Sequence, residues 1–219
     1  MMDFERVLEA RHSERAFRDQ VIPTTTLKKI VNQAQLTPSW ANAQPWQVVI
    51  ATGKTLNEIQ SVFQRRTEQG VAGSSDLEIA HRTNWAEAPR RNMATWSNDL
   101  GRYLAEKNVG ASAYGTSQLS LFNSPALVYL IVPAPVNSWE TFDTGAFAQT
   151  LMLSAANQGV QSMPAYEIVK YPDELRRILK LNSGQKILMG IALGYADESV
   201  INGFRTSRVA TDDILTIQD

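Results

Sequence analysis

Residues 38–51 read Pro-Ser-Trp-Ala-Asn-Ala-Gln-Pro-Trp-Gln-Val-Val-Ile-Ala, and the rest of the chain is organised around this stretch. Proline fixes its own φ and biases the preceding residue toward an extended conformation, so Pro38 should end the helix before it. Pro45 should hold the backbone open just before a β-branched strand over residues 46–51. Ser39, Asn42 and Gln44 then lie on a rigid loop at a sheet end, where binding groups tend to sit. A plain helix-to-strand connection with water-facing polar residues is the alternative.

Two further apolar runs predict the rest of a sheet. Residues 126–132 (Ala-Leu-Val-Tyr-Leu-Ile-Val) are continuously apolar and of strand length, which is typical of a central strand. Residues 187–195 form the last strong strand, and Gly190 and Gly194 within it indicate close approach of another backbone or a ligand.

Apolar residues at helical spacing predict the helices between these strands. They fall at residues 4–10, after a Thr24–Thr26 cap, after Gly53, at 85–104, at 145–158 behind Asp143 or Thr144, and from Pro172 onward. The segment 145–158 is apolar nearly all round, so we expect it to be buried in a core or between subunits. Residues 64–83 are expected to form a mobile surface excursion, and 110–123 a broken helix or loop. Helices and strands alternate irregularly without a repeat or linker, which predicts an α+β fold in one domain, residues 1–219.

Composition excludes several classes of protein and site. Lys+Arg 21 against Asp+Glu 22 gives a net charge of -1, so there is no nucleic-acid footprint or membrane-surface patch, although near-neutrality permits self-association. No apolar run is long enough to span a bilayer, and the N-terminus does not have the pattern of a signal peptide. The absence of cysteine excludes disulfides and thiolate chemistry and fits a cytoplasmic location. With only two histidines, no metal site is expected.

The motifs of self-contained catalysis are absent. The chain has no G-x-G-x-x-G, no P-loop, no H-E-x-x-H and no G-x-S-x-G. If the protein is an enzyme, a bound cofactor therefore carries the chemistry. Arg11 and Arg15 near Ser13, and Arg205 and Arg208 near Thr206, offer the guanidinium and hydroxyl groups that a phosphate monoester needs. A solvated charged surface is the alternative for each run alone.

Four motifs in order give a specific resemblance. They are Arg11-His12-Ser13-x-Arg15-x-Phe17, Pro38-Ser39-x-x-Asn42-x-Gln44-Pro45-Trp46, Ala192-Leu193-Gly194-Tyr195 and the closing arginines. Together they resemble the flavin-dependent nitroreductase family along nearly the whole chain, with 64–115 as a variable helical excursion. The resemblance implies a mainly antiparallel or mixed sheet of four to five strands flanked by helices, and a C-terminal extension that reaches the partner subunit.

The resemblance also implies the site. Members of this family are homodimers with two FMN sites, each built from both chains. Arg11, His12, Ser13 and Arg15 would hold the ribityl phosphate and pyrimidine edge, and Arg205 and Arg208 the phosphate, with their relative weight left open. Pro38, Ser39 and Asn42 would come from the partner, while Pro164, Ala165 and Gln149 would line the ring. The segment 85–91 resembles the part that covers the flavin face in larger members.

The implied activity is an FMN-dependent NAD(P)H oxidoreductase acting on nitroaromatics, quinones or similar flat acceptors. Hydride would pass through flavin N5 in a ping-pong cycle, with Arg15 as electrostatic support and no catalytic side chain. Trp40, Trp85 and Phe122 are candidates for the acceptor-facing wall, with core packing as the alternative. Two other functions stay open: a dehydrogenase or dehalogenase of the same superfamily, and a flavin-binding redox protein without turnover. The sequence does not settle NADH against NADPH, the physiological acceptor, or the hydrogen-bond partner of N5.

Overall fold

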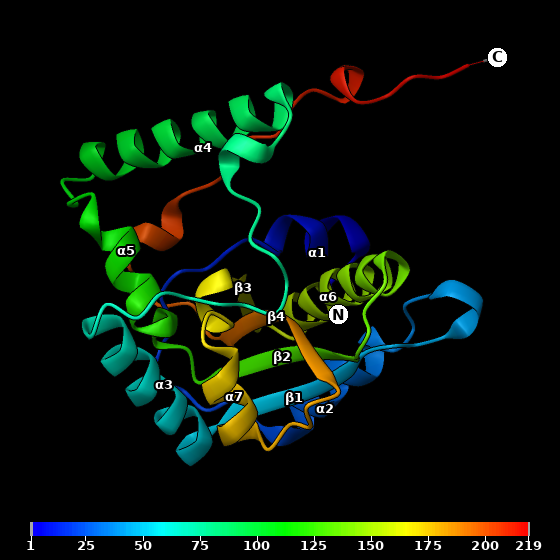
Figure 1. Ribbon diagram of the computed structural model, residues 1–219. Helices are drawn as coiled ribbons and strands as arrows, with labels where there is room; N and C mark the ends of the chain where they lie inside the picture. The colour runs from blue at the N-terminus through cyan, green and yellow to red at the C-terminus, as the bar shows by residue number, and fades with distance from the viewer. Residues whose placement is uncertain (1, 219) are drawn as a thin grey trace.

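The computed structural model describes residues 2–218 and is built on a four-stranded antiparallel sheet with the order β1-β2-β4-β3 (Figure 1). The strands are β1 (Gln47–Thr52), β2 (Ala126–Pro133), β3 (Gln161–Pro164) and β4 (Gln185–Gly194). The α-helices within the described residues are α1 (Phe4–Ala10), α2 (Thr24–Ala34), α3 (Gly53–Glu68), α4 (Glu87–Glu106), α5 (Ser112–Leu119), α6 (Ser138–Asn157) and α7 (Pro172–Leu179). The α+β class and a mainly antiparallel sheet of four to five strands were predicted correctly, although only three of the four strands were located in the sequence.

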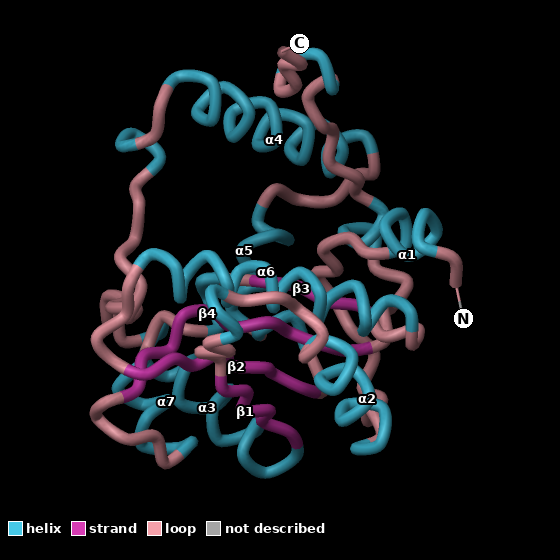
Figure 2. Tube along the Cα trace, turned by 90° about the vertical axis from the view of Figure 1, so that its right-hand side faces the viewer, coloured by secondary structure: helices cyan, strands magenta, loops and turns pink. Residues whose placement is uncertain are grey.

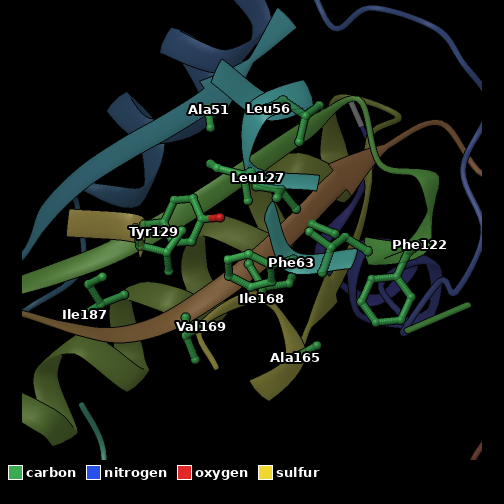
Figure 3. Packing of buried hydrophobic residues seen from close by; sticks show 14 of the residues in the cluster. Ala51, Leu56, Phe63, Phe122, Leu127, Tyr129, Ala165, Ile168, Val169 and Ile187 are labelled. Atoms are coloured by element: carbon green, nitrogen blue, oxygen red, sulfur yellow. The ribbon is translucent and has the colours of Figure 1, made fainter. Parts of the chain in front are cut away.

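The sheet is buried on both faces because β2 is apolar at every position but its last. Successive side chains of a strand point to opposite faces. Leu127, Tyr129 and Ile131 accordingly join the cluster under α3 and α7 (Figure 3), whereas Val128 and Leu130 join the cluster under α2 and α6. This arrangement gives three layers: helices, sheet, helices.

The two glycines of β4 mark close approaches, but the neighbours are side chains and not the backbone or ligand that the sequence indicated. A Cβ atom at Gly190 would lie 2.3 Å from Ile168 Cγ2, and one at Gly194 would lie 2.7 Å from Phe17 Cδ1. The missing Cβ atoms thus let the side chains of Ile168 and Phe17 pack directly on β4. Phe17 is 3% exposed and fixes the extended N-terminal segment against the sheet.

Helix α4 stands apart from the sheet (Figures 1 and 2). Its buried residues Leu100 and Leu104 pack with Phe204 of the C-terminal segment in a small separate cluster. Tyr103 Oη also donates a hydrogen bond to the Val200 carbonyl, at 2.9 Å. The C-terminal segment therefore fixes α4 in place.

Three predicted boundaries were wrong. Helix α6 begins at Ser138 and not at residue 145, because Asn137 and Glu140 form a capping box at its N-terminus; Asp143 is buried inside the helix and caps nothing. The three threonines do not cap α2, which begins at Thr24 directly after Pro23. The expected excursion from residue 64 starts as helix, since α3 continues to Glu68. Strand β3 was not predicted at all, and residues 110–123 form α5 and a 3-10 turn, which is a broken helix.

Candidate functional site

The two arginine runs from opposite ends of the chain meet at one pocket. Its volume is about 250 Å³, and it lies between α1, the extended segment after α1 and the C-terminal segment. Its lining contains six of the predicted site residues: Arg11, His12, Ser13, Arg15, Arg205 and Arg208. The structure thus brings together two runs that the resemblance, and not their residue types alone, assigned to one phosphate site.

Backbone hydrogen bonds hold the N-terminal half of the pocket against β3. Ser13 forms a parallel bridge with Ser162, and the Glu14 amide donates to the Ser162 carbonyl at 3.1 Å. The Phe17 amide donates to the Phe122 carbonyl at 3.1 Å. Side chains of the segment are thereby presented from a fixed backbone.

The pocket carries uncompensated positive charge. Among residues 2–218, no ion pair includes Arg11, Arg15, Arg205 or Arg208. Burial lowers the pKa of Arg11, and the nearby charge of Arg208 lowers it further. Burial also lowers the pKa of Arg15, which is 4% exposed; Tyr114 and Glu14 act against this effect, and the charge of Arg205 adds to it. An anion in the pocket would relieve these repulsions, and guanidinium groups suit a phosphate in particular.

Buried polar atoms without a partner occur in and beside this pocket, and those of His12 and Arg15 belong to residues that line it. Within the described residues, all such side-chain atoms except the Tyr129 hydroxyl belong to residues 12–15 and 161–162. They include Arg15 Nε, Glu14 Oε2 and Ser162 Oγ. Because buried polar groups are normally hydrogen-bonded, this concentration marks the pocket as a place where a polar ligand fits.

His12 is a brace within this segment. Its Nδ1 donates to the Ala10 carbonyl at 2.9 Å, and its Nε2 lies 2.5 Å from Glu14 Oε1. In the part of the chain that the structure describes, only Nδ1 makes a hydrogen bond; Nε2 lies beside the Glu14 carboxylate but is among the buried atoms without a hydrogen-bond partner.

The loop of residues 38–46 lies outside this pocket within the chain. Ala41, Asn42 and Gln44 have φ values of 44°, 61° and 45°, although none is glycine. Two contacts hold this strained loop: the Gln44 amide donates to Ser39 Oγ at 2.9 Å, and the Trp40 amide donates to Asp143 Oδ2 at 2.9 Å. Strained backbone of this kind costs roughly 1–3 kcal/mol per residue and clusters at functional sites.

Three other predicted residues do not line the pocket. Pro164 pairs with Ile191 at the end of β3, two residues beyond the Ser162 that bridges to Ser13. Ala165 is 7% exposed, and its amide donates to the Gly190 carbonyl at 3.1 Å. Gln149 is exposed on α6.

The three aromatic candidates differ in surroundings. Phe122 is fully buried in the core (Figure 3), which is the core-packing alternative that the sequence left open for it. Trp40 is 60% exposed and lies 4.7 Å, between ring centroids, from Trp139. Trp85 is also exposed.

Sequence reasoning missed three residues that surround Arg15. The rings of Tyr114 and Phe204 each lie 5.8 Å from the Arg15 guanidinium carbon, and the Asn202 side chain binds the backbone of Arg15. Asn202 and Phe204 directly precede the closing arginines, which was the one available signal. Tyr114 lies in the weakly patterned segment and gave none.

No cluster of metal-ligating side chains occurs in residues 2–218. In the same residues, no helix is both long enough and apolar enough to cross a membrane.

Comparison with known proteins agrees with this geometry. Residues 8–195 match the model of the nitroreductase family. A 4-nitrobenzoate reductase of Pseudomonas putida is 28% identical over 94% of this chain and 91% of its own length. The nitroreductase NfnB of Mycolicibacterium smegmatis is 27% identical over 95% of this chain and 90% of its own. The crystal structure of the FMN-dependent nitroreductase NfnB from Mycobacterium smegmatis in complex with NADPH superposes with a TM-score of 0.89, at 25% identity, covering 98% of this chain and 97% of that one.

Proposed function

The chain belongs to the nitroreductase family, and from this premise we propose that it is an FMN-dependent NAD(P)H oxidoreductase that reduces nitroaromatics, quinones and similar flat acceptors. The observation that carries the proposal is the pocket of four arginines without carboxylate partners, which suits the phosphate of FMN.

The hydrogen-bond donors of the pocket suit both the phosphate and the pyrimidine edge of FMN. Arg11 and Arg208 lie close enough for the charge of Arg208 to lower the pKa of Arg11, so a phosphate between them is stabilised by both. Arg15 has a buried Nε without a partner, which is a suitable donor to the pyrimidine edge of the flavin. Its fixed positive charge would stabilise the negative charge that develops there on reduction.

FMN held by these residues would supply the hydride and electron-transfer chemistry between a nicotinamide and the acceptor. The residues of the chain bind and orient the cofactor in this proposal. The arginines hold the phosphate, and the strained loop presents Ser39 and Asn42 from a rigid backbone. NADPH is the first donor to test, because it is bound in the solved relative.

A homodimer completes the site in this proposal. Pro38, Ser39 and Asn42 lie outside the pocket of their own chain, so the partner subunit is the source that we propose for them. The surface beside the loop is apolar, as an interface requires: Trp40, Trp139, Phe142 and Leu36 are 60%, 56%, 69% and 84% exposed.

The C-terminal segment supports the same assembly. Ile214 and Ile217 are 76% and 83% exposed, and β1 is an edge strand of the sheet. A groove of about 760 Å³ runs beside that edge between β1 and α2, with Leu27, Val31, Val48 and Ile50 in its lining. We propose that the segment after Arg208 from one protomer lies along β1 of its partner, where it buries these side chains and supplies backbone hydrogen bonds to the edge.

Turnover tests the activity. Without oxygen, protein supplied with FMN is expected to oxidise more than one equivalent of NADPH only when 4-nitrobenzoate or a quinone is present, and the FMN-free protein is expected not to do so. A flavin that only some other substrate reduces would point to a different reaction of the same fold. Bound FMN without any turnover would point to a binding protein. A cytoplasmic location stays a prediction and is tested by cell fractionation.

A further inference from the structure

Asn202 ties together segments that lie 187 residues apart. Its Oδ1 accepts hydrogen bonds from the amides of Arg15 at 2.7 Å and Ala16 at 3.1 Å. Its Nδ2 donates to the Ala16 carbonyl at 2.7 Å and to Asp197 Oδ1 at 3.2 Å. The side chain is 7% exposed, so these bonds replace its water contacts almost completely.

The same residue also holds the second arginine. The Asn202 carbonyl accepts a hydrogen bond from Arg205 Nη1 at 2.6 Å. The Asn202 amide donates to the Ser199 carbonyl at 3.0 Å, which closes the turn that carries Arg205. Asn202 therefore sets the backbone of Arg15 and the side chain of Arg205 relative to each other.

Arg15 and Arg205 need such hydrogen bonds to keep their positions. Arg15 is buried, its Nη1 donates only to the Ser13 carbonyl at 2.9 Å, and the rings of Tyr114 and Phe204 flank its guanidinium. Arg15 and Arg205 carry like charges close enough to influence each other. Arg205 is exposed, so without a restraint its side chain would sample many positions, and the pocket would have to reassemble each time an anion binds.

We propose that Asn202 is a positioning residue that pre-organises Arg15 and Arg205 for the anionic ligand of the pocket. This rests on the proposed function only in naming FMN as that ligand. A pre-organised site binds more tightly because the ordering is complete before the ligand arrives.

The first test reads the position of Arg15 without any flavin. In full-length, FMN-free protein labelled with ¹⁵N-arginine, the Arg15 Nε–H signal should be shifted by the two flanking rings and protected from solvent exchange. Arg15→Lys identifies this signal by removing it. Asn202→Ala is expected to move it toward the position of a solvent-exposed arginine and to raise its exchange rate.

The matched control removes an equally buried polar tie elsewhere. Ser124 is 1% exposed, and its Oγ bonds to the carbonyls of Ala126 and Leu193 at 2.7 and 2.8 Å, away from the pocket. Ser124→Ala should lower stability but leave the Arg15 signal in place. If Asn202→Ala does not fold, Asn202→Asp serves instead, because it keeps the two acceptor bonds and loses the donor bonds to Ala16 and Asp197.

The second test reads ligand binding. Asn202→Ala should weaken FMN binding about tenfold and make the flavin reduction potential more negative, whereas Ser124→Ala should change neither. A variant that loses stability but keeps the Arg15 signal, the FMN affinity and the potential would overturn the proposal. Wild-type protein that binds no FMN would refute the proposed function, while the Arg15 signal would still decide whether Asn202 positions it.

Discussion

At the scale of single residues, the account depends on four arginines that lack acidic partners. Burial lowers the pKa of Arg11, and the like charge of Arg208 across the pocket lowers it further. A phosphate with two negative charges would turn this repulsion into attraction. The residue types were readable from the sequence, but their meeting was not, since almost the whole chain separates them.

Replacing Arg208 tests this charge balance. Arg208→Gln is expected to weaken FMN binding by about tenfold or more, because a hydrogen bond between charged groups contributes about 1.5–3 kcal/mol. Binding of riboflavin, which has no phosphate, should change little. Fluorescence titration with both flavins measures this difference. Arg177→Gln is the control, since Arg177 is exposed on α7 and pairs with Glu58 and Glu174; equal losses for FMN and riboflavin would contradict the phosphate assignment.

Tyr129 offers a test at the same scale in the core. Its ring is fully buried on β2 (Figure 3), its hydroxyl has no hydrogen-bond partner within the described residues, and burial raises its pKa. Tyr129→Phe removes the unsatisfied hydroxyl and should raise the free energy of unfolding by about 1 kcal/mol. Urea unfolding at fixed protein concentration measures it. A loss of stability would mean that the hydroxyl has a partner, such as a buried water.

At the scale of elements, the strongly patterned segments were predictable and the weakly patterned ones were not. Helix α7 begins at Pro172 and β2 fills its apolar run, as their residues indicated. Strand β3 has only four residues and ends in Pro164, so its own sequence does not predict a strand. It forms because it pairs with β4 at the edge of the sheet. The start of α6 was misplaced because Asp143 looked like a cap, whereas its carboxylate binds the amide of Trp40.

Asp76 fastens the segment between α3 and α4 to the sheet. Its carboxylate, 7% exposed, accepts hydrogen bonds from Arg176 and from the Ile187 amide. Burial alone would raise the pKa of Asp76, but these bonds and the charges of Arg176 and Lys186 outweigh burial and lower it. A carboxylate with a lowered pKa stabilises the fold above its unfolded pKa and loses that contribution as the pH falls through the folded value.

Asp76→Asn should therefore cost about 2 kcal/mol at neutral pH, and its deficit should shrink as the pH falls below about 4. Urea unfolding across this range measures the change. Asp173→Asn is the matched control, because Asp173 pairs with Arg66 but its side chain is 61% exposed, so the loss should be small. A deficit for Asp76→Asn that does not depend on pH would refute an electrostatic role.

At the scale of the whole molecule, the four motifs were enough to predict the fold. A single chain does not form the whole proposed site, because Pro38, Ser39 and Asn42 lie outside the pocket. Asn202 could not be predicted from the sequence, because it belongs to no motif and its side chain bonds to Arg15, 187 residues away. The loop of residues 38–46 was recognised by its prolines, yet what completes it is a second copy in our proposal. Neither the long-range contacts of Asn202 nor the proposed contact between two copies of the chain leaves a local pattern in the sequence.

Removing residues 210–219 tests the proposed exchange of C-terminal segments. The shortened chain keeps all four arginines but loses Ile214, Leu215 and Ile217, which the groove beside β1 would bury. It is expected to dissociate to monomers at concentrations where the full chain is dimeric, and to lose FMN affinity in parallel. Sedimentation velocity with and without FMN measures both. A shortened chain that stays dimeric with full FMN affinity would contradict a role for this segment.

The measurement that tests the central claim most directly is the visible absorption spectrum of the purified protein, before and after NADPH or NADH is added without oxygen. The account predicts a bound-flavin spectrum that bleaches with one equivalent of nicotinamide per FMN and returns when a nitroaromatic acceptor is added. A protein that binds no FMN, or one whose bound flavin stays oxidised with both nicotinamides, would contradict it.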